Sequence, residues 1–277
     1  MIKGRDIIIH LAVKYSGDWN KIYGAIKEKE PASREEIEAS LAMVKSQAMT
    51  IIDEDYPEAL KKIYKPPFVL FYYGEKALWN YDHNILAVIG SRQPSNYGVT
   101  MTRSIVTSLV EEHVMIVSGL AKGIDHIAHD TAIQHGGKTI AVLGSGIDRP
   151  YPSETKDTYE VMKRQQLVVS EYPGLVEPNK DNFPWRNRII AGLSEAVFVS
   201  EAKKRSGTLI TVGYALYLGK DVFVLPHPAN VDNSGNRLIR DGAILVESGQ
   251  DILDELKKTP HEEVLDVAPD PLPKNFI

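Results

Sequence analysis

Eight short apolar runs rich in Val, Ile and Leu recur along the chain from residue 68, and segments with helical spacing separate them. The runs are near-continuous rather than strictly alternating, which is typical of strands buried on both faces. Strands that alternate with helices form parallel sheets through right-handed crossovers. The sequence therefore predicts a doubly wound, mainly parallel α/β sheet. The expected strands are residues 68–73, 85–90, 115–119, 139–144, 167–171, 196–201, 221–226 and 244–248.

Helical spacing between these runs predicts helices over residues 99–112, 124–135, 155–164 and 209–218. The first part of the chain has a different texture, with short helices expected at 7–13, 21–27 and 33–46 and Ser33 as the cap of the third. We therefore expect a small helical accessory domain at 1–58 and an α/β domain at 59–258. The last residues, 259–277, contain four prolines and an acidic pair and are expected to form a polar tail.

Composition narrows the classes of protein that this chain can belong to. The 277 residues include no cysteine, which excludes disulfides, thiol catalysis and thiolate metal sites. No apolar run approaches the roughly 18 residues of a membrane span, and the first residues do not form a signal peptide, so we expect a cytoplasmic protein without membrane contact. The net charge is −5, but residues 61–250 carry 21 Lys and Arg against 19 Asp and Glu. Acidic flanks around a mildly basic body are compatible with a local basic groove.

Small residues follow many of the predicted strands and open the next helix. In an open parallel sheet these loops meet at the carboxyl ends of the strands, where ligands bind. Backbone N–H groups there approach anions closely, and helix N-termini add a favourable dipole. The sequence thus predicts a phosphate-binding floor. Its loop residues are Gly90, Ser91, Ser118, Gly119, Gly123, Gly144, Ser145, Gly146, Ser206, Gly207 and Thr208, and its charges include Arg92 and Lys122.

The stretch from Phe183 to Ser194 adds Arg186, Asn187 and Arg188 beside Trp185. Arginine presents a planar fork of donors that suits phosphate, and an exposed tryptophan ring can stack on a base. The alternative is an amphipathic helix whose arginines are solvated.

Motifs that bind nucleotides do not fit this chain. Gly144-Ser145-Gly146 begins like a dinucleotide fingerprint, but Arg149 occupies the place of the third glycine. Gly136-Gly137-Lys138-Thr139 resembles a phosphate-binding P-loop, yet a helix precedes it and a strand follows, which is the reverse of that motif. We expect a helix C-cap there.

Candidate catalytic and metal-binding groups also have structural interpretations. His126 and His129 lie one turn apart, but no third ligand is evident, so no metal site is predicted. None of the serines in turns occupies a Gly-x-Ser-x-Gly elbow, and each is better explained as a cap or phosphate donor. Glu171 and Glu201 end buried strands and are expected to orient arginines rather than to act as acids or bases.

Taken together and in this order, these segments resemble the DNA-processing protein A family, also called Smf. The resemblance covers about residues 55 to 255 and is carried by the stretches 90–92, 118–125, 144–148 with 151–152, 170–173, 183–194, 206–211, 235–239 and 242–243. It implies an extended Rossmann-like domain that binds single-stranded DNA rather than a dinucleotide. It also implies a homodimer that protects incoming single strands in natural transformation and helps to load the RecA recombinase, with no cofactor and no catalysis.

The resemblance further implies that Arg92 contacts the DNA backbone and that the loops at Lys122, Gly144–Gly146 and Ser206–Thr208 line the pocket. Lys180 is the nearest match to a basic residue that contributes in the family. Lys122 stands where the family often has arginine, which keeps the charge but loses the fork.

Two other functions stay open at this stage. Phosphoribohydrolases share a similar fold but need a catalytic glutamate in the helix after their glycine-rich loop, and no Glu occurs from Thr208 to Lys220. A sensor that binds a free nucleotide on the same floor would instead show ligand-induced thermal stabilisation.

Overall fold

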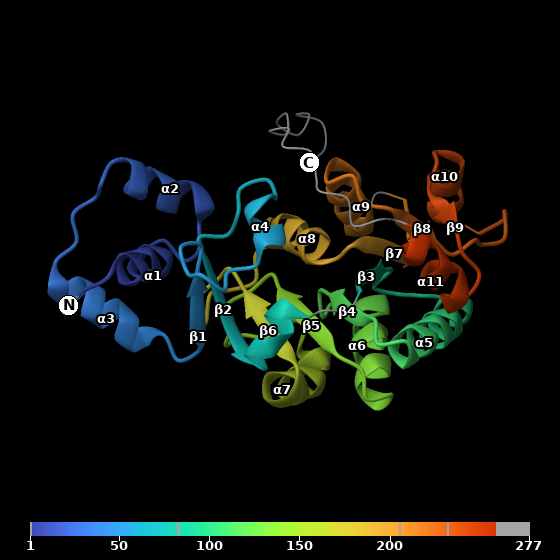
Figure 1. Ribbon diagram of the computed structural model, residues 1–277, viewed down its shortest axis with the longest axis horizontal. Helices are drawn as coiled ribbons and strands as arrows, with labels where there is room; N and C mark the ends of the chain where they lie inside the picture. Colours follow the sequence, from blue (N-terminus) through green and yellow to red (C-terminus); the bar gives the residue numbers. More distant parts are fainter. Residues whose placement is uncertain (1, 82–83, 205, 232, 259–277) are drawn as a thin grey trace.

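The computed structural model describes residues 2–81, 84–204, 206–231 and 233–258 of the chain. Within these ranges, nine strands form a single mixed sheet (Figure 1). The strands are β1 Gln47–Thr50, β2 Val69–Gly74, β3 Ile85–Gly90, β4 Met115–Ser118, β5 Thr139–Leu143, β6 Leu167–Ser170, β7 Ala196–Glu201, β8 Val222–Val224 and β9 Ile244–Leu245.

The sheet has the strand order β1-β2-β6-β5-β4-β3-β7-β8-β9. All neighbours from β6 to β9 are parallel, whereas β2 runs antiparallel to β6 and β1 antiparallel to β2. From β3 the chain first adds strands on one side, to β6, and then crosses to the other side of β3 with β7. The boundary between β3 and β7 is therefore the topological switch point of the doubly wound sheet.

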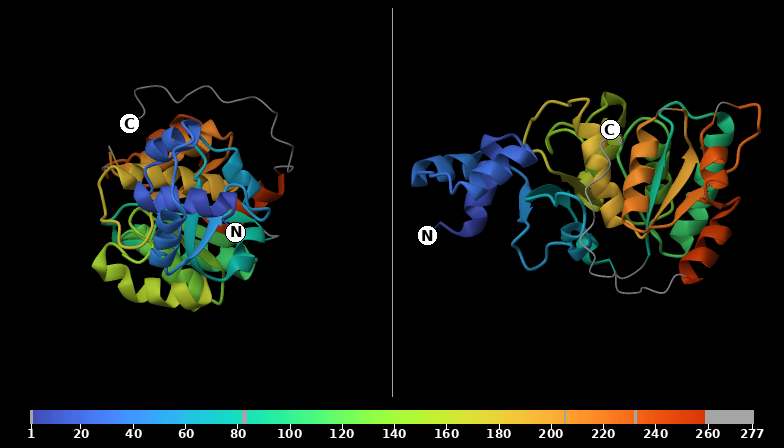
Figure 2. Two further views of the ribbon diagram at one scale, coloured as in Figure 1. Left: turned by 90° about the vertical axis from the view of Figure 1, so that its left-hand side faces the viewer. Right: turned by 90° about the horizontal axis from the view of Figure 1, so that it is seen from above.

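Helices cover both faces of this sheet. Figure 1 shows α8 and α9 on one face, α5, α6 and α7 on the other, and α1 to α3 beyond β1 at one end; Figure 2 shows the same end projecting from the sheet. The helices are α1 Gly4–Lys14, α2 Trp19–Lys27, α3 Arg34–Met43, α4 Glu58–Lys61, α5 Asn96–Glu111, α6 Ile124–Gln134, α7 Lys156–Gln165, α8 Asn182–Leu193, α9 Gly207–Tyr217, α10 Gly235–Arg240 and α11 Gly249–Lys258.

Strand β3 lacks polar side chains because helices cover it on both faces. Ala87 and Ile89 pack in the cluster that contains α8 and α9, while Leu86 and Val88 pack in the cluster that contains α5 and α6. Since both faces are covered, alternation of polar and apolar residues is lost. The predicted α/β sheet is confirmed, and its eight expected strands correspond to β2 through β9.

The first part of the chain differs from its prediction. Residues 47–50, which follow the third predicted helix inside the predicted helical domain, form β1 and extend the sheet. The third helix begins after the predicted cap Ser33, whose side chain accepts from Glu36 N, but it ends at Met43. The predicted tail at 259–277 lies outside the described residues. None of the helices in the described ranges has the length and apolar character needed to cross a membrane.

Candidate nucleic-acid interface

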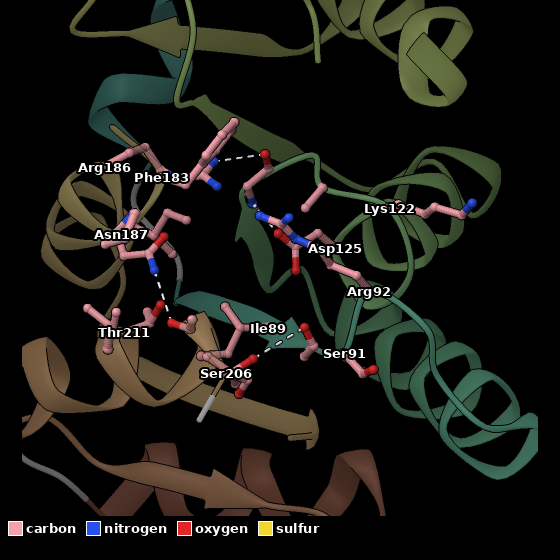
Figure 3. A pocket seen from close by; sticks show the side chains of 18 of the residues that line it. Ile89, Ser91, Arg92, Lys122, Asp125, Phe183, Arg186, Asn187, Ser206 and Thr211 are labelled. Atoms are coloured by element: carbon pink, nitrogen blue, oxygen red, sulfur yellow. Dashed lines mark hydrogen bonds between the residues drawn. The ribbon is translucent and has the colours of Figure 1, made fainter. Parts of the chain in front are cut away.

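A pocket of about 1010 Å³ opens at the switch point (Figure 3). It is lined by residues that follow β3 (Ser91 and Arg92), β4 (Gly119 and Lys122) and β7 (Ser206). The carboxyl ends of these three strands meet at the sheet edge where the order of connections reverses. The pocket therefore occupies the position at which open α/β sheets bind their ligands.

Three helices begin at this pocket. Phe183 in the first turn of α8, Thr208 in the first turn of α9 and Asp125 in the first turn of α6 all line it. Unpaired N–H groups and the helix dipole make such N-termini favourable for anions. The hydroxyl of Ser206 has no hydrogen-bond partner among the described residues and is able to donate to an anion.

Exposed cations surround the same opening. Arg92, Lys122, Lys180 and Lys203 line the pocket, and all four are exposed. Glu154 partly offsets them, because its carboxylate lies 3.5 Å from Lys122 Nζ. Both members of the pair are exposed, so the ion pair contributes little to stability. With four exposed cations and one exposed acid in its lining, the pocket rim is positively charged.

The floor of the pocket contains a buried arginine. The Arg186 guanidinium donates to Gly119 O at 2.8 Å and to Val142 O, and only 4% of the residue is exposed. Burial lowers the pKa of Arg186 to about 10, so the group stays protonated at neutral pH. Asp125 accepts from Gly119 N at 3.2 Å, and burial raises the pKa of its carboxyl above the usual range. Gly119 thus connects a buried cation to a buried acid.

Most of the predicted site residues are brought together at this pocket. Its lining includes Gly90, Ser91, Arg92, Gly119, Lys122, Lys180, Arg186, Asn187, Ser206, Gly207 and Thr208. It does not include Ser118, Gly123, Gly144, Ser145, Gly146 or Arg188. Arg205, which precedes the loop at Ser206–Thr208 and is a further candidate charge of the floor, lies outside the described residues.

Arg188 occupies the opposite side of α8. Its Nη2 donates to Glu171 Oε1 at 2.6 Å, its Nε donates to Lys65 O, and the residue is 1% exposed. Trp185 also faces away from the pocket, with its Nε1 bonded to Glu171 Oε2 at 3.0 Å. The structure therefore gives Arg188 a buried ion pair in place of the predicted contact with phosphate. It also bears out the prediction that Glu171 orients an arginine.

The small residues outside the pocket serve close packing. A Cβ on Gly144 would lie 2.7 Å from the Phe183 ring, and one on Gly146 would lie 2.2 Å from Gly174 O. Gly123 has a φ of +88° and abuts Ser91 O. The Ser118 hydroxyl donates to Val88 O, and the Ser145 hydroxyl donates to Arg149 O. These residues shape the loops that surround the pocket without lining it.

Two aromatic residues, Phe183 and Tyr151, line the pocket but are not among the predicted site residues. The Phe183 ring lies 5.6 Å from the Tyr151 ring and 5.5 Å from the Arg92 guanidinium. Phe183, Asn187 and Ile190 recur at a spacing of four and three and lie on one side of α8. The helical periodicity of this segment, which is visible in the sequence, places these three residues on a different side of α8 from Arg188.

Other polar groups have structural partners. His129 Nδ1 pairs with Thr139 Oγ1, and His126 Nε2 pairs with Thr158 Oγ1. Gly136 has a φ of +72° just after α6, as a helix C-cap requires. Glu201 accepts from the backbone N–H and the hydroxyl of Ser95, and it has no arginine partner among the described residues.

The fold defines a Rossmann-like protein with a pocket rimmed by exposed cations at the switch point of its sheet. Residues 47–257 match the family described as DNA recombination-mediator protein A, and the chain belongs to this family. It is 45% identical to DNA processing protein DprA of Streptococcus pneumoniae over 212 residues, which cover 76% of this chain and 74% of that protein. It is 41% identical to protein Smf of Escherichia coli over 233 residues, which cover 81% of this chain and 61% of that protein.

Solved structures agree with this assignment. The X-ray structure of DNA processing protein A from S. pneumoniae superposes with a TM-score of 0.81 at 38% identity, covering 92% of this chain and 99% of that one. A structure of DNA processing protein A from Helicobacter pylori, which concerns its single-stranded DNA binding mode, gives a TM-score of 0.71 at 29% identity. That match covers 78% of this chain and 99% of the other.

Proposed function

We propose that this chain is a single-stranded DNA-binding recombination mediator and that the pocket at the switch point holds the strand. The observation that carries the proposal is the convergence of three helix N-termini with the exposed cations Arg92, Lys122, Lys180 and Lys203. Phosphates supply the matching charge, and the Phe183 and Tyr151 rings offer apolar surface to a base. The H. pylori relative supports the choice of single strands.

We further infer that the protein acts as a binder without a catalytic step. Its family is described as a recombination mediator, and the buried acid of the pocket, Asp125, already accepts from Gly119 N. A RecA-class recombinase and a second copy of the chain are the partners that this role implies. The N-terminal segment at 1–58 is proposed as an accessory domain whose strand β1 attaches it to the sheet.

Substitution of one exposed arginine tests the position of the site. Arg92→Ala is expected to weaken binding to every single-stranded sequence alike and to reduce the log–log salt slope by about 0.7 for each phosphate that the variant no longer neutralises. Arg103→Ala is the matched control, because Arg103 is exposed on α5 and does not line the pocket. Equal affinities of the two variants at matched salt would remove Arg92 from the site.

A further inference from the structure

Five aromatic side chains gather outside the pocket, and none of them is fully buried. They are Trp19, Tyr23, Tyr64, Phe68 and Trp185, and together with Lys65 we call them the aromatic surface. Trp19 stacks on Tyr23 and on Phe68 with ring centroids 5.1 Å apart in each case, and Tyr64 meets Trp185 edge-on at 6.3 Å. Tyr23 is 48% exposed, so this part of the surface faces solvent.

The Lys65 ammonium group lies close to three rings of this surface. Its Nζ lies 4.9 Å from the Trp19 ring, 5.4 Å from the Tyr64 ring and 5.6 Å from the Trp185 ring. It also donates to Asn20 Oδ1 at 2.7 Å. The backbone of Lys65 has a φ of +49°, a left-handed conformation that a residue with a side chain seldom adopts. The loop therefore places an ammonium group between rings from α2 and α8, at a cost in backbone strain.

The aromatic surface lies along the same sheet edge as the pocket. Strand β2 runs antiparallel to β6, with Phe71 opposite Ser170, so the loop before β2 lies at the carboxyl end of β6. The pocket lies at the carboxyl ends of β3, β4 and β7 on the same edge. The amino end of α8 separates the two, because Phe183 and Pro184 line the pocket while Trp185 contacts Tyr64. A strand that leaves the pocket across this helix end arrives at the aromatic surface.

Charge along this path is compatible with a polyanion. Lys61, Lys62 and Lys65 occur within five residues, and of these Lys61 pairs with Glu58. Of the acids near this path, Glu171 is neutralised by Arg188 and its carboxylate also accepts from Trp185, whereas Asp181 just before α8 is exposed. Basic residues interleaved with aromatic rings are typical of surfaces that bind single-stranded nucleic acid through phosphate contacts and base stacking.

We propose that a single strand held in the pocket continues over the amino end of α8 and stacks its bases on the aromatic surface. This inference rests on the proposed function of the pocket. The surface adds length-dependent affinity, because a short strand fills the pocket alone and a longer one reaches both regions. Stacking tolerates every base, so the added affinity is independent of sequence.

Tryptophan fluorescence tests the proposal directly. The chain has three tryptophans, of which Trp79 is only 7% exposed and packs inside the core. In the full chain, oligo-dT of about 30 nucleotides is expected to quench Trp19 and Trp185, whereas oligo-dT of about 6 nucleotides is expected to bind without quenching. The variant Trp19→Phe keeps only Trp185 and the buried Trp79, so the quenching that remains in it comes from Trp185. Binding of the long strand with unchanged fluorescence would overturn the proposal.

Affinity measurements on variants give a second test. Tyr23→Ala removes a ring that is half exposed, so the fold is retained, and the affinity for the long strand should fall at least about fivefold while that for the short strand is unchanged. Lys65→Met should have the same selective effect. Lys163→Met is the matched control, since Lys163 also covers a ring, that of Tyr73 at 3.9 Å, but in the last turn of α7.

The outcomes distinguish this inference from the proposed function. Failure of both strands to bind the unaltered protein would contradict the function of the pocket itself. Equal affinity for short and long strands, or equal losses for both in the variants, would leave the pocket intact and overturn the role of the aromatic surface.

Discussion

Arg186 and Arg188 stand two positions apart in α8, and both are buried, yet they act in different places. Successive helical residues are rotated by about 100°, so two positions apart means nearly opposite sides of the helix. Arg186 lies under the pocket and donates to Gly119 O, whereas Arg188 pairs with Glu171 on the far side. Residue type alone suggested one common role for both arginines, and the local geometry separates them.

The close approach of Gly119 to Arg186 leads to a first prediction. A Cβ at position 119 would lie 2.4 Å from the Arg186 guanidinium, so Gly119→Ala must displace a buried charge. We expect a loss of about 1–3 kcal/mol in the free energy of unfolding. Denaturant unfolding measures it. Gly207→Ala is the control, because a Cβ there meets no atom within 4 Å, and a loss as large in that variant would contradict the explanation.

Arg188 supplies a second prediction. Because Arg188→Met leaves Glu171 without its ion-pair partner, we expect about 3–5 kcal/mol of destabilisation. The folded variant should bind oligo-dT of about 6 nucleotides, which fills the pocket alone, within about twofold of the unaltered protein, since the residue does not line the pocket. If the single variant does not fold, the double variant Arg188→Met/Glu171→Gln removes the unpaired charge and allows the same binding measurement. A large loss of affinity in a folded variant would place Arg188 in the site.

At the scale of elements, the buried strands were predictable, and the edge strand was not. β3 to β7 are apolar at nearly every position because helices cover both faces. β1 has only the four residues Gln47–Thr50, and half of them are not buried, so it carries no comparable pattern. Its formation depends on pairing with β2, an interaction between distant parts of the chain that no local signal reveals.

The pocket was predictable to the extent that it follows from topology. Loops after β3, β4 and β7 were expected to meet, and they do. The loop at Gly144–Gly146 has the same composition, but its glycines accommodate Phe183 and Gly174, a packing requirement visible only in three dimensions. Phe183 and Tyr151 were not predicted, because no local pattern shows that two rings so far apart in the sequence meet at the pocket.

A third prediction concerns the packing of α6 on β5. Burial lowers the pKa of His129 to about 3, whereas an unfolded histidine titrates near about 6.5. The unfolded state therefore binds the additional proton, and stability is lost as the pH falls from about 6.5 toward 3. At pH 5 the loss relative to pH 7.5 should be about 2 kcal/mol.

His129→Gln serves as the comparison for this pH dependence. Glutamine keeps a hydrogen-bonding group near Thr139 but does not titrate, so the variant should lose about 2 kcal/mol less between pH 7.5 and pH 5. Unfolding by urea at the two pH values gives the difference. Identical pH dependence of the two proteins would show that His129 is not the group responsible.

At the scale of the whole molecule, an acidic protein presents a basic site. The net charge is −5, yet exposed cations surround the pocket at the switch point of the sheet. Acidic flanks oppose non-specific attraction of polyanions to the rest of the molecule, while the exposed cations make one sheet edge favourable for anions. The aromatic surface lies on that same edge, so the geometry favours a path along the edge over a single isolated pocket.

Binding of single-stranded DNA is the central claim, and it is tested most directly by fluorescence anisotropy. Labelled oligo-dT of about 30 nucleotides is titrated at two salt concentrations beside the matching duplex. We expect a strong preference for the single strand and an affinity that falls with salt by about 0.7 log units per log unit for each phosphate contacted. Equal binding of duplex and single strand, or no binding at low salt, would contradict the claim.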